Sequence, residues 1–177
     1  MMQVIEHYEV PSGGDASIVF NNIPQDFTDL LISLSARTTI ADVTQYVTFT
    51  FNGSTSGYGF RYLFGNGGLG AGVFSSSGSR SDMLGPIISG NNATANTFGN
   101  AQIYLPNYSA SISKAISIDA VMEQNVTEAY PQIWTGIWDN INPITSIAFT
   151  ASSPFVEYSS ATLYGILAGS DGITTAS

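Results

Sequence analysis

The chain has 177 residues, of which 44% are hydrophobic and only 10% are charged, so it can bury a core but has few charges for its surface. Four basic residues face thirteen acidic ones, and this net charge of −9 excludes classes of protein that bind nucleic acid or anionic membranes. The absence of cysteine excludes disulfides, thiolate metal sites and cysteine nucleophiles.

The N-terminus, MMQVIEHYEV, has no basic segment followed by an apolar one, which a secretory signal peptide requires. No apolar run reaches the roughly 18 residues of a membrane span. We therefore expect a chain that folds in a cytoplasm, carries no signal peptide and does not insert into a membrane.

Short alternating segments separated by Gly, Pro, Asn and Ser turns predict about ten to twelve β-strands. One segment, Asp29–Arg37, is rich in leucine and is compatible with a helix, but its alternating serines favour a strand. The expected strands are Val4–Val10, Ala16–Phe20, Asp29–Arg37, Thr44–Phe51, Tyr58–Phe64, Leu84–Ser89, Ala101–Leu105, Ala115–Met122, Gln132–Asp139, Ile144–Ala151 and Ser160–Ile166.

Turn residues predict how some of these strands pair. Asn52-Gly53 indicates a tight reversal that would make Tyr58–Phe64 the antiparallel partner of Thr44–Phe51. The last two strands are joined by a polar turn containing Pro154, which predicts a closing hairpin that completes a sheet built by earlier residues. Pro86 lacks the N–H that a central strand donates, so it predicts an edge strand.

These elements predict an all-β fold, a jelly-roll-like antiparallel β-sandwich that forms a single domain over residues 1–166. The mixture of tight turns with long connections, such as Asn66–Ser81 and Ser89–Asn100, favours a jelly roll over an up-and-down barrel. Both long connections are expected to be surface loops. Residues 167–177 form a small, polar tail, which we expect to be ordered by a neighbouring chain.

No motif in the sequence indicates catalysis. The glycines of GNGGLGAG resemble a phosphate-binding loop, but no helix-forming segment and no lysine follow them. His7 is the only histidine and is expected on the surface of the first strand, and no GxSxG motif accompanies it. Thirteen acidic residues include no pair that a local motif marks for glycoside hydrolysis. We expect a protein without catalytic, cofactor-binding or metal-binding residues.

The aromatic residues leave two interpretations open, a sugar-stacking platform or the filling of a core or subunit interface. The residues concerned are Tyr58, Tyr62, Tyr104, Tyr108, Tyr130, Trp134 and Trp138. In the strand that holds the tryptophans, Ile133 and Ile137 alternate with them, so both faces are apolar. This pattern predicts a core strand lying between two layers.

Several segments in a fixed order also suggest a family. Ile23-Pro24 with Thr28–Leu30, then Pro106–Lys114, then Ile144–Ile166 resemble elements of a domain found repeatedly in virion proteins of tailed bacteriophages, particularly phages of aquatic bacteria. The likeness covers most of the chain from Phe20 onward. It implies a jelly-roll-like domain of a capsid decoration protein, a head fibre or a tail fibre, and it carries over no catalytic residues.

The function expected from this resemblance is a non-enzymatic virion structural protein, most simply a capsid decoration or cement subunit. Its partners would be the major capsid protein or other virion proteins, and copies of itself, with a homotrimer favoured. The alternative is a tail-fibre or head-fibre module that recognises a host surface glycan. A glycan-degrading enzyme is a third reading without a supporting motif.

Overall fold

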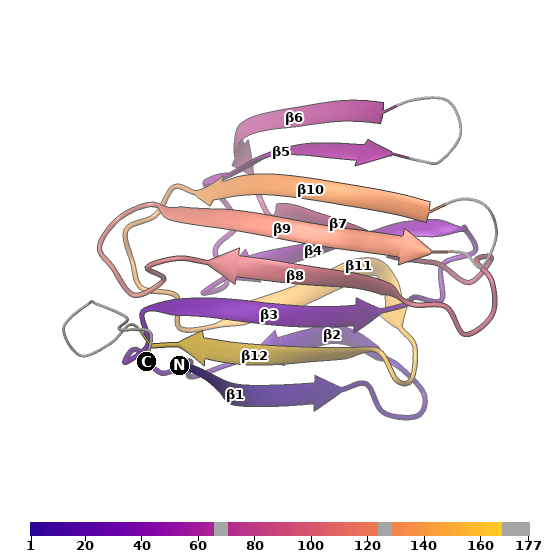
Figure 1. The fold of residues 1–177 in the computed structure, drawn as a ribbon, viewed down its shortest axis with the longest axis horizontal. Coiled ribbons are helices and arrows are strands. Elements are labelled where there is room, and N and C mark those ends of the chain that lie inside the picture. Colours follow the sequence, from indigo (N-terminus) through magenta and orange to yellow (C-terminus); the bar gives the residue numbers. More distant parts are fainter. Residues whose placement is uncertain (66–70, 124–128, 168–177) are drawn as a thin grey trace, which may run out of the picture.

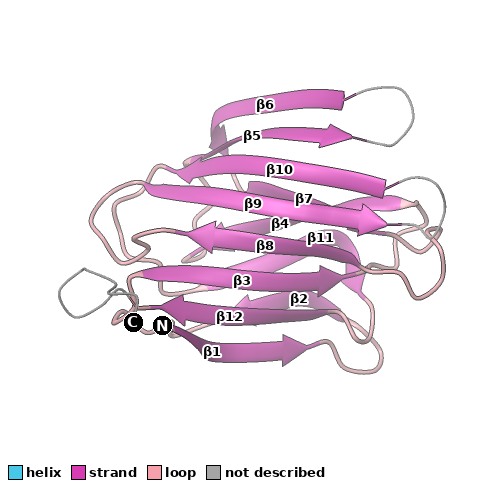
Figure 2. Cartoon of the chain, viewed as in Figure 1, coloured by secondary structure: helices cyan, strands magenta, loops and turns pink. Residues whose placement is uncertain are grey.

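Twelve strands make up the regular structure of this computed structural model, which describes residues 1–65, 71–123 and 129–167, with the backbone alone for 71–79 and 123 (Figure 2). The strands are β1 (Met2–Glu9), β2 (Asp15–Phe20), β3 (Asp29–Ala36), β4 (Thr44–Phe51), β5 (Tyr58–Gly65), β6 (Ala71–Arg80), β7 (Met83–Ser89), β8 (Gly99–Leu105), β9 (Lys114–Glu123), β10 (Ala129–Trp138), β11 (Ile147–Phe155) and β12 (Ser160–Ile166). The predicted number of strands is confirmed. Within the described ranges there is no helix long and apolar enough to cross a membrane.

The strands form two antiparallel sheets that pack face to face (Figure 1). The eight-stranded sheet has the order β1-β12-β3-β8-β9-β10-β5-β6, and the four-stranded sheet has the order β2-β11-β4-β7. The chain crosses between the sheets at every step except β5 to β6, β8 to β9 and β9 to β10, whose strands all belong to the eight-stranded sheet. As a result β1-β12-β3-β8 faces β2-β11-β4-β7, which is the double Greek-key order of a jelly roll. The predicted jelly-roll-like sandwich is confirmed.

Four additional strands widen the eight-stranded sheet beyond this jelly-roll core. β5 and β6 are inserted between β4 and β7 along the chain, and β9 and β10 are inserted between β8 and β11. Strand β7 of the smaller sheet packs across the core against β8, β9, β10 and β5. The insertions therefore give one side of the molecule a long outer sheet face.

An aromatic cluster holds this widened part of the sheet to the smaller sheet. Trp134 of β10 and Tyr62 of β5 stack with ring centroids 3.7 Å apart, and Tyr46 of β4 meets both rings edge-on. The hydroxyl groups of Tyr46 and Tyr62 are hydrogen-bonded at 3.0 Å, and burial raises the pKa of Tyr62 well above its usual value. Each aromatic pair adds about 0.5–1.5 kcal/mol beyond the area it buries.

A buried amide ties the two sheets together next to this cluster. Gln132 Oε1 accepts the backbone N–H of Ile87 at 2.7 Å, and Gln132 Nε2 donates to the Ile87 carbonyl at 3.0 Å. Trp134 Nε1 donates to the same Oε1 at 3.2 Å. Ile87 belongs to β7, which lies at the edge of its sheet as Pro86 predicts. The amide satisfies buried polar groups on both strands, which a core requires.

Both predicted hairpins are wrong, because the segments concerned lie in opposite sheets. β4 belongs to the four-stranded sheet and β5 to the eight-stranded one. Asn52 and Gly53 take the expected positive φ angles, 53° and 66°, but the turn leads the chain across the sandwich. Likewise β11 lies between β2 and β4, whereas β12 lies between β1 and β3. Alternation determines which face of a strand is buried, not which strand becomes its neighbour.

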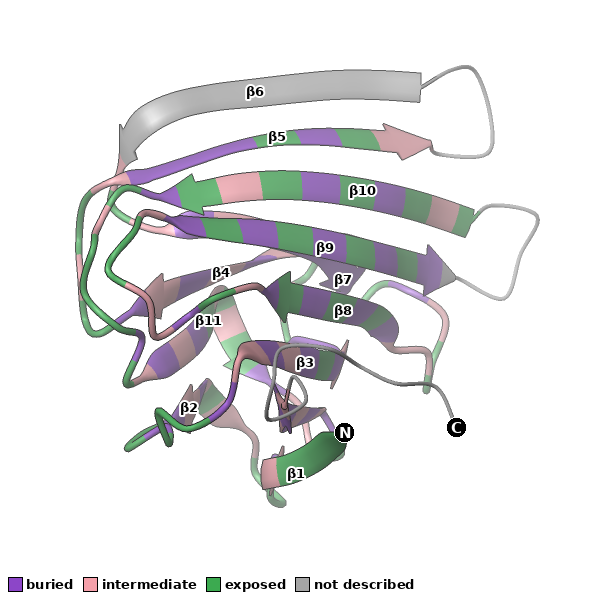
Figure 3. Cartoon of the chain, turned by 60° about the vertical axis from the view of Figure 1, so that its left-hand side comes forward, coloured by how far each residue is buried: buried purple, intermediate pink, exposed green. Residues whose placement is uncertain are grey.

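Two predictions about single segments also need correction. Ala71–Arg80, expected within a surface loop, forms the edge strand β6, because pairing with β5 outweighs the low strand propensity of Ser and Gly. The rest of the glycine-rich run, residues 66–70, lies outside the described residues. Strand β10 is buried on one face only: Trp134 is in the core, whereas Ile133 is 62% exposed (Figure 3).

Met1 is bound to its own chain near the end of β12. The Leu167 N–H donates to the Met1 carbonyl at 2.9 Å, and the Met1 amino group donates to the Leu167 carbonyl at 3.1 Å. Of the tail 167–177, predicted to be ordered by a neighbouring chain, only Leu167 is described, and it is bonded to its own chain. Residues 168–177 lie outside the described residues, and the ordering of the tail by a neighbouring chain stays a prediction.

Candidate functional site

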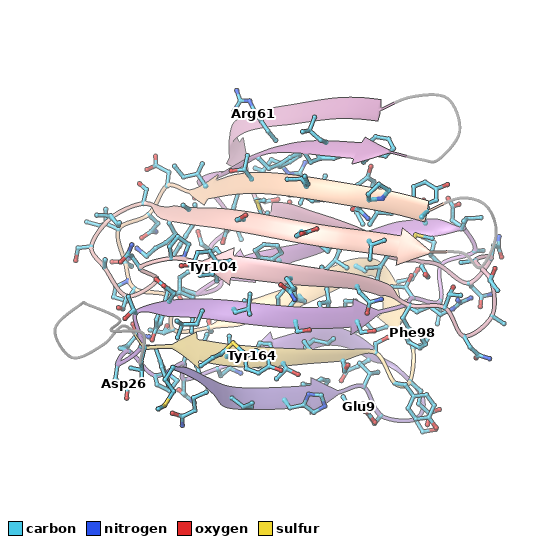
Figure 4. The ribbon with its side chains drawn as sticks, viewed as in Figure 1. Glu9, Asp26, Arg61, Phe98, Tyr104 and Tyr164 are labelled. Carbon is cyan, nitrogen blue, oxygen red and sulfur yellow. The ribbon has the colours of Figure 1, made fainter. Side chains whose placement is uncertain are left out.

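A cavity of about 580 Å³ lies at one end of the sandwich, between the β7–β8 loop and the β11–β12 turn. The loop wall consists of Asn91, Ala95, Asn96 and Phe98. The turn wall consists of Val156, Glu157 and Tyr158. Arg37, which directly follows β3, completes the lining, and Phe98 marks this end of the molecule in Figure 4. We call this hollow the Arg37 cavity.

The main chain of Arg37 holds the turn wall. Its N–H donates to Ser159 Oγ at 3.1 Å, and the Ser159 hydroxyl donates back to the Arg37 carbonyl at 3.1 Å. The Val156 N–H donates to that same carbonyl at 3.0 Å. On the other side of the turn, Tyr158 N–H donates to the Val10 carbonyl at 3.1 Å. The turn is therefore fixed from two directions.

The side chain of Arg37 holds the loop wall. Nη1 donates to the carbonyls of Thr94 at 2.7 Å and Thr97 at 3.0 Å, and Nη2 donates to those of Asn91 at 3.1 Å and Ala93 at 3.0 Å. All four acceptors are neutral, and burial lowers the pKa of Arg37. The guanidinium nonetheless stays charged, because arginine is protonated throughout the physiological range. The buried guanidinium of Arg37 therefore orders the β7–β8 loop.

Each wall carries a residue in the left-handed backbone region. Asn96 has φ 64° and Tyr158 has φ 69°. Asparagine tolerates this conformation, but it costs an ordinary L-residue roughly 1–2 kcal/mol. The side chain of Tyr158 is 66% exposed, so burial in the core does not offset that cost. Packing therefore does not account for a tyrosine at this position.

The lining residues suit binding better than catalysis. Glu157 is the only carboxylate among them, whereas hydrolysis of a glycosidic bond ordinarily uses two. His7 lies on the exposed side of β1, as predicted, where its Nδ1 is 2.8 Å from Thr162 Oγ1, and it does not line the cavity. The aromatic rings and side-chain amides of the walls instead provide contacts for a polar ligand.

The seven aromatic residues considered for sugar stacking do not form one surface platform. Those buried in the core are Tyr58, Tyr62, Tyr108, Trp134 and Trp138. Tyr130 is packed against the core, and the Tyr104 hydroxyl donates to Asp29 Oδ2 at 2.9 Å. None of the seven lines the Arg37 cavity. The aromatic residues that line the cavity are Phe98 and Tyr158. The sequence pattern does not predict them, because neither belongs to an alternating segment.

A second feature is the outer face of the widened sheet. Four large aliphatic side chains on three adjacent strands are between 44% and 62% exposed: Leu63 of β5, Val121 of β9, and Ile133 and Ile137 of β10. Ile133 lies directly opposite Leu63 in the β5–β10 ladder, and both line a hollow of about 270 Å³. We call these four residues the outer apolar face. Apolar residues gathered in this way mark contact surfaces.

The basic side chains are mostly engaged inside the molecule. Lys114 is buried, its Nζ donates to the Ala110 carbonyl at 2.8 Å, and burial lowers its pKa. Arg80 pairs with Asp82 at 2.7 Å. Arg61 is exposed on β5 (Figure 4). The described surface therefore carries isolated cations rather than a basic patch.

Among residues 1–65, 71–123 and 129–167, no group of three or more His, Asp or Glu side chains is placed to hold a metal ion. Comparison with protein-family models finds none that matches the chain, and no curated protein matches it.

Proposed function

We propose that this chain is a non-enzymatic structural protein of a tailed-bacteriophage virion, made in the host cytoplasm and attached to the capsid as a decoration or cement subunit. The resemblance of its segments to phage virion domains supports the proposal, as does its jelly-roll order. The observation that carries it is the outer apolar face, since this surface offers contacts to another protein and carries no catalytic group.

The outer apolar face has the make-up of an interface core. Ile133 and Ile137 project from the same side of β10; Leu63 of β5 lies opposite Ile133, and Gly59 lies opposite Ile137. Single exposed aliphatic residues are ordinary on protein surfaces, but a cluster on adjacent strands favours burial against a partner. A sheet face is also rigid, so it binds by shape with little loss of conformational freedom. The proposed partner is the major capsid protein.

Self-association accompanies this proposal. Only 10% of the residues are charged, so an interface between copies would bury few charged side chains. Closed cyclic symmetry is the default for copies of one chain, and a homotrimer on a local threefold axis fits a decoration subunit.

Attachment is tested with capsids that lack this protein, to which purified variants are added and counted. Ile133→Ser should reduce the number of bound copies, because it removes the most exposed aliphatic side chain of the outer apolar face. Ile141→Ser is the matched control, since Ile141 is equally exposed, at 62%, but lies in the loop after β10. Equal binding of both variants and the unaltered protein, or a few copies confined to the tail of native particles, would contradict the proposal.

A second candidate function, recognition of a host surface glycan by a head-fibre or tail-fibre module, is favoured by one observation. The Arg37 cavity presents an exposed aromatic ring beside side-chain amides. Copy number separates the two roles, because decoration needs many copies on the shell and a fibre tip needs few.

A further inference from the structure

The Arg37 cavity is built before any ligand arrives. The backbone of Arg37 fixes the turn wall through Ser159 and Val156, and its guanidinium fixes the loop wall through four carbonyls. Arg37 therefore positions both walls of the cavity. A site ordered in this way loses little conformational freedom on binding. Its volume of about 580 Å³ falls within the range of roughly 300–1,000 Å³ found for small-molecule sites.

Polar side chains on both walls are left unengaged by the protein. Asn91 and Asn96 lie on the loop wall and Glu157 on the turn wall, and none of these three side chains is hydrogen-bonded to another described residue. The two amides each offer a donor and an acceptor, and the carboxylate accepts only. Paired donors and acceptors of this kind match the hydroxyl groups of a sugar.

Aromatic rings complete the lining. The Tyr158 ring is exposed at the rim although its backbone adopts an unfavourable conformation, and Phe98 lies in the opposite wall. A ligand with an apolar face and polar edges would contact rings and amides at once, as tyrosine- and asparagine-rich binding loops do. The C–H face and hydroxyl rim of a pyranose have this character.

The charges of the lining point to a neutral ligand. Arg37 contributes one positive charge and Glu157 one negative charge, and no other lining residue is charged at neutral pH. The guanidinium donors that are directed at backbone carbonyls are not available to bind a carboxylate or a phosphate. An acidic sugar would meet the unpaired carboxylate of Glu157 instead.

We propose that the Arg37 cavity binds a neutral hexose unit of a glycan, with the sugar ring against Tyr158 and its hydroxyl groups on Asn91, Asn96 and Glu157. This inference rests on the second candidate function for the class of ligand, but it does not depend on attachment to a capsid. The cavity lies at the loop end of the sandwich, and the outer apolar face lies on β5, β9 and β10.

The test is calorimetric titration of the purified protein with soluble neutral oligosaccharides of glucose, galactose and mannose, and with uronic-acid oligosaccharides for comparison. We expect saturable binding of at least one neutral set and weaker or no binding of the acidic set. Tyr158→Gly should weaken binding by about tenfold or more, since exposed tyrosines often dominate such sites. Glycine also accepts the positive φ, so strained folding cannot explain that loss.

Matched variants guard against indirect effects. Tyr158→Asn, which also tolerates the backbone conformation, should behave like Tyr158→Gly. Asn96→Gly should weaken binding, whereas Asn22→Gly, at another exposed asparagine with positive φ (51°), should not. Tyr104→Ala removes an exposed tyrosine from the sheet face and should also leave binding unchanged. Ile133→Ser should bind sugar normally even if it no longer attaches to capsids.

Three results would overturn the proposal. These are the absence of binding to every neutral oligosaccharide, binding that Tyr158→Gly and Asn96→Gly leave unchanged, and a preference for the acidic set. None of them bears on capsid attachment, which is measured separately with Ile133→Ser.

Discussion

Arg37 and Ser159 exchange two hydrogen bonds, from the Arg37 N–H to Ser159 Oγ and from the Ser159 hydroxyl to the Arg37 carbonyl, each at 3.1 Å. The residues are 122 positions apart in the chain, and both are buried. This exchange joins the end of β3 to the β11–β12 turn. Because the Arg37 guanidinium also holds the β7–β8 loop, the exchange sets how the two walls of the cavity face each other.

Ser159→Ala should therefore lower the free energy of unfolding by about 1–3 kcal/mol, since it leaves the Arg37 N–H without its partner and removes one of the two donors to the Arg37 carbonyl. Urea denaturation followed by tryptophan fluorescence measures this change. Ser160→Ala is the control, because Ser160 is the next residue but is only partly buried. Equal effects of the two substitutions would mean that the exchange does not stabilise the turn.

Gln132→Leu should destabilise the fold by about 2–4 kcal/mol although leucine has a similar size. The change removes the partners of the Ile87 N–H and carbonyl and of Trp134 Nε1, and unsatisfied buried polar groups cost roughly 1–3 kcal/mol each. Thermal unfolding measures the loss. Gln102→Leu, on the exposed side of β8, is the control and should change stability by less than about 0.5 kcal/mol.

Tyr8→Phe should change the pH dependence of stability. The Tyr8 hydroxyl donates to Asp15 Oδ2 at 2.6 Å, and this hydrogen bond is the main reason why the pKa of Asp15 is lowered; the Ser17 N–H contributes less. A carboxyl whose pKa is lowered by folding adds stability above its unfolded pKa, near 3.9, and that stability is lost as the pH falls through the folded pKa.

The same bond raises the pKa of Tyr8, so its contribution is present below about pH 10 and is lost as the pH rises through the folded pKa. The stability difference between the unaltered protein and Tyr8→Phe should be largest between about pH 5 and pH 9, and it should shrink in acid and in base. Melting temperatures across this range test it. Tyr158→Phe is the control, and a difference that is constant from pH 2 to pH 11 would contradict the assignment.

Gly165→Ala should cost about 1–3 kcal/mol, because the new Cβ would lie 2.3 Å from Cγ of the buried Phe27 ring. Gly65→Ala is the control, since its Cβ would meet Pro131 at an ordinary 3.6 Å. Adding Phe27→Leu to Gly165→Ala should recover part of the loss, which a double-mutant cycle by urea denaturation measures. Strictly additive effects would show that the two residues do not compete for this space.

Local pattern predicted the strands but not the surfaces that the proposals use. Thr44–Phe51 was expected as a strand and is one with the same bounds, because side chains that alternate in character suit a half-buried strand. The same pattern predicts that Ile133 and Ile137 of β10 are core residues, yet among the described residues both are exposed on the outer face of the sheet. Tyr158 was overlooked, since its positive φ and its exposure depend on contacts of the turn with Val10 and Arg37.

By itself the sequence determined the class of fold, the approximate number of strands and the face of most strands that is buried, because these follow from a two-residue period and from turn residues that act locally. Only the tertiary structure decided that β4 and β5, and β11 and β12, part into opposite sheets, and that Arg37 organises a cavity. Those features arise from contacts between residues far apart in the chain, and a local sequence pattern does not predict such contacts.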